Sequence, residues 1–165
     1  MRDDALRLYH QQTIEIWEQF CRLHHELYER TCDEYQALLS GEIESLEPLI
    51  SEKESLMKEI GTWENRRAEL IATLNQSGVS EAPVVSVTDL LNLMAEPEAK
   101  LAIPALRNLN ALLIDVITRL QEQNRRNQQF LNRAMHSLNE LKQSFRGPKN
   151  YVTYGADGAT RPAGR

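Results

Sequence analysis

The stretch from Asp3 to Leu39 contains neither glycine nor proline, and its apolar side chains recur at helical spacing. The steps between them alternate between three and four residues, apart from one gap that Thr13 fills, which is the pattern of a heptad seam. The seam residues are Leu6, Tyr9, Ile16, Phe20, Leu23 and Leu27. The spacing predicts one long helix that ends at Ser40 and Gly41, with Gly41 in the left-handed position that closes many helices.

A second helix is predicted to begin near Ser45, which can cap it, with Pro48 tolerated inside the first turn. Lys53 and Arg67 fall on its apolar seam, where their aliphatic stems can cover apolar surface while the charged ends reach water. The apolar members of the seam are Leu46, Leu49, Leu56, Ile60, Trp63, Leu70 and Leu74.

A linker, "NQSGVSEAPVVS", separates this helix from a short one, "VTDLLNLMAE". Ser86 or Thr88 is expected to cap the short helix, and Pro97 is expected to follow it. A last long helix is predicted from about Ile103 to Phe145. Its apolar seam consists of Leu106, Leu109, Leu113, Val116, Leu120, Phe130, Leu131, Ala134, Leu138, Leu141 and Phe145.

The seam of the last helix is interrupted at "QEQNRRNQQ", where Gln123 and Asn127 occupy seam positions. One interpretation is that a polar seam residue fixes the register of a coiled coil, at some cost in stability. The other is that the helix changes partners here, so that the part from Phe130 to Phe145 offers an apolar face to a partner helix. The sequence leaves both open, as it does the continuity of the helix through this stretch.

These elements predict an all-α fold, an elongated antiparallel helical bundle or coiled coil of three long helices and one short helix. The bundle is expected to occupy residues 1–146. Gly147 and Pro148 should end the last helix and open a flexible C-terminal tail over residues 147–165. The run "APVVSV" is the only β-prone segment, and it is too short to build a sheet.

Composition excludes several function classes. The formal net charge is −5 and the pI is near 5.4, which argues against nonspecific binding to nucleic acid or acidic lipid. No apolar run approaches the ~20 residues of a membrane span, and "MRDDALRLYHQQ" lacks the apolar core of a secretory signal. A cytoplasmic protein with no membrane insertion and no nucleic-acid partner is therefore expected.

No catalytic motif appears, so an enzyme and a cofactor are not expected. Cys21, His25 and Cys32 fall at steps of four and seven on one helical face, and such side chains can bind zinc. The spacing lacks a tight cysteine pair and a fourth ligand, so ordinary half-buried cysteines and a surface histidine are favoured, with no metal.

Three segments resemble the FlgN family of flagellar export chaperones. "SEKESLMKEI" with the following "ENRR" is similar to the family's second helix, and "LQEQNRRNQQFL" to its Asn-x-x-Asn stretch. "TYGADG" closely matches the Tyr-Gly-x-Asp-Gly motif of the family's tail. The resemblance covers about Leu46 to Gly158, and it implies a non-catalytic chaperone of the bacterial cytosol.

The resemblance also implies partners. Such chaperones bind the C-terminal region of hook–filament junction proteins, keep them unassembled and deliver them to the gate of the flagellar type III export apparatus. The substrate-binding residues would be Asn124, Asn127, Phe130, Leu131, Ala134, Leu138, Leu141 and Phe145. The cytosolic domain of the gate would contact Tyr154, Gly155, Asp157 and Gly158. The alternative is a self-associating structural coiled-coil protein with no export role.

Overall fold

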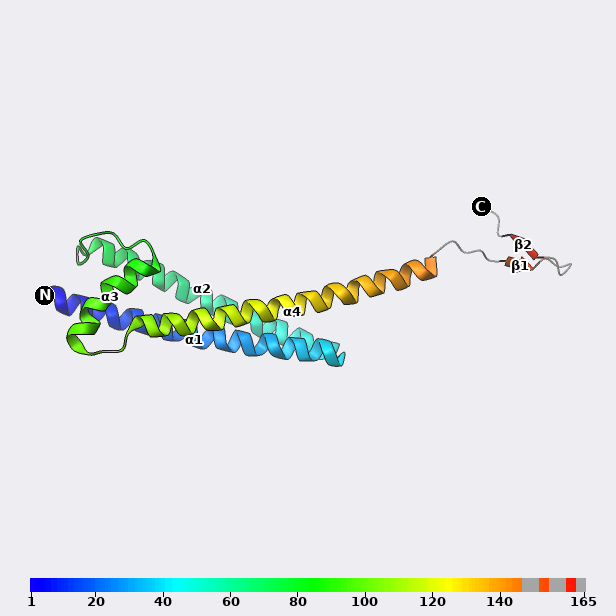
Figure 1. The fold of residues 1–165 in the computed structure, drawn as a ribbon, viewed down its shortest axis with the longest axis horizontal. Helices are drawn as coiled ribbons and strands as arrows, with labels where there is room; N and C mark the ends of the chain where they lie inside the picture. The colour runs from blue at the N-terminus through cyan, green and yellow to red at the C-terminus, as the bar shows by residue number, and fades with distance from the viewer. Residues whose placement is uncertain (147–151, 155–159, 163–165) are drawn as a thin grey trace. The chain divides into compact units, whose positions relative to one another are not determined.

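The computed structural model describes residues 1–146, 152–154 and 160–162 of the chain. Its elements, shown in Figure 1, are α1 (Arg2–Ser40), the 3-10 turn η1 (Ile43–Ser45), α2 (Leu46–Gln76), α3 (Val87–Leu101), α4 (Leu106–Arg146), β1 (Val152–Tyr154) and β2 (Thr160–Pro162). Three long helices and one short helix dominate, which confirms the predicted all-α class. The chain forms two compact units, Met1–Asn127 and Gln128–Arg165. The predicted domain limit at 146 stays a prediction.

The end of α1 follows the prediction. Gly41 adopts φ 71°, in the left-handed region, and its amide donates to the carbonyl of Ala37. A residue with a Cβ is strained in this conformation, so glycine is the favoured residue here. The chain then turns directly through η1 into α2.

The predicted cap of α2 is only half right. Ser45 occupies the N-cap position, but its backbone is already helical and its side chain makes no capping hydrogen bond. The preceding turn η1 runs directly into α2, and the Leu46 amide donates to the carbonyl of Ile43. At α3, by contrast, Ser86 accepts from the Asp89 amide and the Asp89 carboxylate accepts from the Ser86 amide, which completes a capping box.

Two predicted boundaries around α3 and α4 are wrong. Pro97 does not follow α3 but lies inside it, and the helix continues to Leu101. Pro97 is buried on the same side as Leu90 and Met94, so tertiary packing outweighs the hydrogen bond that proline cannot donate. The last helix begins at Leu106 rather than Ile103, because Ala102 takes a left-handed conformation and Pro104 stays in the connection.

The first unit is a bundle in which α1 and α2 run antiparallel (Figure 1). Lys53 of α2 binds Glu34 of α1, whereas Glu59, later in α2, binds the earlier Arg22. The first part of α4 runs parallel to α1. The buried core cluster consists of Ile16, Trp17, Phe20, Leu70, Leu74, Val84, Leu90, Met94, Leu106 and Leu113.

The β-prone run before α3 forms no strand. Val84 is buried there, and the side chain of Asn75 binds both its amide (2.8 Å) and its carbonyl (3.0 Å). An amide side chain thus satisfies the backbone groups that a neighbouring strand would use.

The tail holds strands that the sequence did not predict. β1 and β2 pair antiparallel, with Val152 opposite Pro162 and Tyr154 opposite Thr160. The predicted helix stop at Gly147 and Pro148 lies outside the described residues. Among the helices that the structure describes, none is long and apolar enough to cross a membrane.

Candidate functional site

The C-terminal part of α4 carries an apolar face that is exposed to solvent. Leu131, Leu138, Leu141 and Phe145 keep 38%, 44%, 54% and 72% of their surface accessible. These side chains recur in steps of three, four and seven, so they lie on one side of the helix. With the exposed Ala134 and Met135 they form a continuous surface, called here the exposed α4 face. Met135 was not among the predicted residues, although its position three residues before Leu138 places it on this side of the helix.

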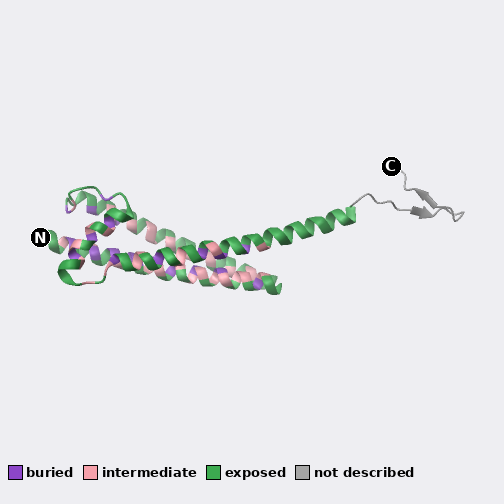
Figure 2. Ribbon diagram, viewed as in Figure 1, coloured by how far each residue is buried: buried purple, intermediate pink, exposed green. Residues whose placement is uncertain are grey.

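The same helix is buried in its first part. Leu106, Leu113 and Leu120 keep only 0%, 8% and 7% of their surface accessible and pack in the bundle. Figure 2 shows this change along α4, which carries buried positions up to Asn127 and almost only exposed ones after it. The helix itself is continuous from Leu106 to Arg146. One uninterrupted helix therefore contributes to the core with one part and presents apolar surface with the other.

A buried polar cluster marks the change. Asn127 is 2% exposed, and its side-chain amide donates to the carbonyl of Thr31 (3.0 Å) and to a carboxylate oxygen of Glu34 (3.1 Å). Its own oxygen accepts from Gln123 at 2.9 Å. The other oxygen of Glu34 binds Lys53 at 2.9 Å. The cluster thus joins α1, α2 and α4, and it requires one register of α4, since any slide would leave buried polar groups unpaired.

For Asn127, this cluster favours the interpretation that a polar seam residue fixes the register of the helices. The predicted substrate-binding role of Asn127 would need a side chain that is now buried and bonded to α1. Asn124 is exposed, and Phe130 is half-buried. The predicted binding residues therefore divide into the buried Asn127, the exposed Asn124, the half-buried Phe130 and the exposed α4 face that follows them.

The predicted tail site is only partly described. Tyr154 is the last residue of β1 and pairs with Thr160 through the backbone register. Gly155, Asp157 and Gly158 lie outside the described residues. The role predicted for these four positions stays a prediction.

The zinc candidates have other partners. The thiol of Cys21 donates to the carbonyl of Leu109 at 3.5 Å, and burial, followed by the charge of Glu18, raises the pKa of this thiol. His25 lies 3.4 Å from Glu29 on the next turn. Both cysteines are free thiols. Cys21 therefore serves as a packing residue between α1 and α4.

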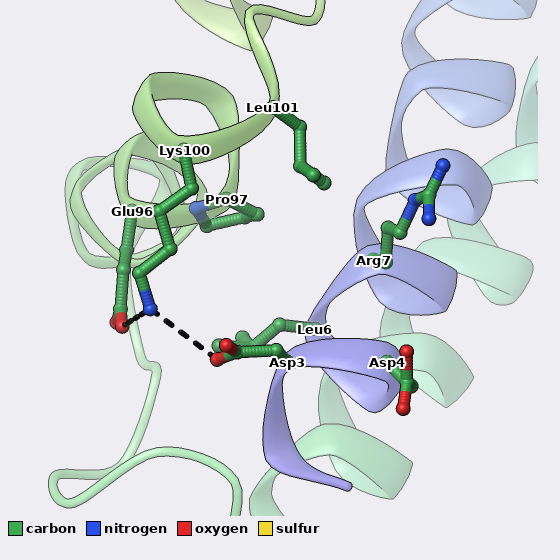
Figure 3. A pocket seen from close by; sticks show the side chains of 8 residues that line it. All are labelled: Asp3, Asp4, Leu6, Arg7, Glu96, Pro97, Lys100 and Leu101. Carbon is green, nitrogen blue, oxygen red and sulfur yellow. Dashed lines mark hydrogen bonds and ion pairs between the residues drawn. The ribbon is translucent and has the colours of Figure 1, made fainter.

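A small pocket of about 190 Å³ lies between the start of α1 and the end of α3. Figure 3 shows Lys100 reaching across its mouth to Asp3 (3.3 Å) and Glu96 (3.1 Å). Hydrogen bonds from Lys100 to Glu96 and Asp3 raise the pKa of the Lys100 ammonium group. The ammonium group of Lys100 and the carboxylates of Asp3 and Glu96 neutralise one another. We therefore interpret these contacts as a link between α1 and α3 and not as a binding site.

A second contact between helices, which was not predicted, involves His10, Glu98 and Leu106. The buried His10 of α1 binds a carboxylate oxygen of Glu98 in α3 at 3.0 Å, and the same oxygen accepts the Leu106 amide at 2.7 Å. Glu98 thereby satisfies one of the unpaired amides at the start of α4. Like the Lys100 contacts, this contact joins helices of the first unit.

A family model described as FlgN protein matches residues 8–162, nearly the whole chain. The chain belongs to the FlgN family. This is a family of flagellar export chaperones, which bind flagellar substrate proteins and are not enzymes. The matched region includes both the exposed α4 face and the tail strands of this FlgN chain. No curated protein and no solved structure matches it.

Proposed function

We propose that this FlgN chain is a cytoplasmic chaperone for hook–filament junction proteins. It binds their C-terminal region, keeps them unassembled and delivers them to the flagellar type III export gate. The exposed α4 face supports the proposal, because Leu131, Leu138 and Phe145 leave a contiguous apolar stripe in water. Such a stripe on a helix suits the apolar side of a partner helix. While the apolar side of the substrate helix is covered in this way, it is not available for assembly.

The first test is capture of junction proteins from a lysate of flagellated bacteria. The full chain should retain a junction protein, and a chain that ends at Gln129 should not, because it keeps the Asn127 cluster but lacks the exposed α4 face. A circular dichroism melt of the shortened chain is the control for folding. If the full chain instead forms stable long oligomers and does not bind junction proteins, the result supports the self-associating coiled coil.

Tyr154 is proposed to anchor the contact with the cytosolic domain of the export gate. Tyrosine offers a large contact area with a hydrogen-bonding tip, and a short tail must rely on one or two such anchors. Tyr154→Ala is expected to leave the bundle's melting temperature and the junction-protein affinity nearly unchanged, because Tyr154 lies outside Met1–Asn127. It should weaken binding of the loaded chaperone to the gate domain.

The measurement is a titration of the substrate-loaded chaperone with the purified gate domain. Thr153→Ala, one residue earlier in β1, is the matched control. If the wild type and Tyr154→Ala bind the gate domain with equal affinity, Tyr154 does not take part in delivery to the gate.

A further inference from the structure

We propose that the exposed α4 face selects an amphipathic helix that carries carboxylates along one edge, and that Lys142 and Arg146 bind those carboxylates. The inference rests on the proposed function, in which this face binds substrate, and adds the chemistry that the substrate helix must have. Two observations support this inference: the positions of the charged side chains around α4, and the separation of acidic and basic residues along the sequence.

Lys142 and Arg146 border the apolar stripe. Each α-helical residue turns by about 100°, so Lys142 lies only about 40° around the helix from Leu138, and Arg146 lies about 80° from it. Both side chains are exposed. Within the described part of the chain, neither forms an ion pair. Two cations therefore stand side by side along one edge of the exposed α4 face, one turn apart.

The other charges of this segment point elsewhere. Arg133 lies about 140° from Leu138 and Glu140 about 160°, on the opposite side of the helix. Glu140, the only acid between residues 128 and 146, lies 3.2 Å from His136 on that far side. The apolar stripe thus has a basic edge with no acidic residue beside it.

Charge is also segregated along the sequence. Residues 1–127 hold 22 Asp and Glu against 13 Lys and Arg, a net charge of −9. Residues 128–146 hold one acid against three bases, a net charge of +2. An acidic partner is therefore repelled by the bundle and attracted to the exposed α4 face. Such complementarity speeds encounter and favours an acidic partner over a neutral or basic one. A second copy would present the same basic edge, which disfavours pairing of two such faces.

The test uses two synthetic amphipathic helices as probes, identical except that one edge carries glutamate in the first and glutamine in the second. Isothermal titration of the full chain should give about tenfold tighter binding of the glutamate peptide, with a preference that falls as salt is raised. The double variant Lys142→Glu, Arg146→Glu should lose this preference and should bind a lysine-edged peptide instead. Arg133→Glu, with the same change of charge on the far side, should keep the wild-type preference.

Equal binding of the two peptides, or the same response from Arg133→Glu as from the double variant, would overturn the acidic-edge inference. So would failure of the wild type to bind either peptide. The proposed function is scored separately by capture of junction proteins with the full chain. If capture succeeds and the peptides show no charge preference, the chaperone function stands and only the inferred edge recognition is lost.

Discussion

A Leu138→Glu variant is expected to lose about thirtyfold or more in affinity for a junction protein, because helix contacts concentrate ~2 kcal/mol or more in single apolar anchors. Its melting temperature should stay close to that of the wild type. Leu138 is 44% exposed in the free chain, so a carboxylate there can be hydrated without unfolding the helix. Affinity by titration and a thermal melt on the same samples provide the measurement.

Gln143→Glu is the matched control, since it adds the same charge about 140° away from Leu138 on the same helix. It should bind substrate like the wild type. If Leu138→Glu unfolds the protein instead, this part of α4 belongs to the core and the assignment of the exposed α4 face is wrong.

Leu113→Ala is expected to destabilise the bundle by roughly 2–5 kcal/mol, because it removes a buried side chain and leaves a cavity. Leu113 is 8% exposed and belongs to the core cluster of α1, α2, α3 and α4. A loss of this size is a large share of the ~5–15 kcal/mol that holds an ordinary domain together. Urea unfolding followed by circular dichroism measures the change in the free energy of unfolding.

Leu112→Ala provides the comparison at the neighbouring position, where the side chain is 58% exposed. Its effect should stay within about 0.5 kcal/mol, as for most surface substitutions. Equal stability of Leu113→Ala and Leu112→Ala would mean that the first part of α4 is not packed in the core.

Much of the fold could be predicted because heptad spacing and helix stops are local signals. The spacing of Ile16, Phe20 and Leu23 marks the buried side of α1, and Gly41 ends that helix where predicted. Ser86 is also recognisable, since a serine followed three residues later by an acid forms a capping box. These features depend on residues within a few turns of one another.

The failures involve contacts between distant residues. Pro97 is a helix breaker by local rules, and its burial between α3 and α1 accounts for the continuation of α3 through it. Asn127 interrupts the apolar seam in the sequence, but only the structure gives its partners Thr31 and Glu34, which lie on another helix. The strands of the tail are three residues long, too short for an alternation pattern to reveal. The binding residues themselves stay predictions, because exposure shows that a surface is available and not what occupies it.

The continuity of α4 has a consequence for the thermodynamics of capture. Starting a helix is the unfavourable step of helix formation, whereas extending one adds a hydrogen bond for each residue that is fixed. Residues 106–127 are held helical by the bundle, so they act as a nucleus from which residues 128–146 can propagate. An isolated peptide of that length would be marginally helical in water. In the proposed binding mode, residues 128–146 are therefore already helical before the substrate binds, and the entropy lost on association falls mainly on the substrate.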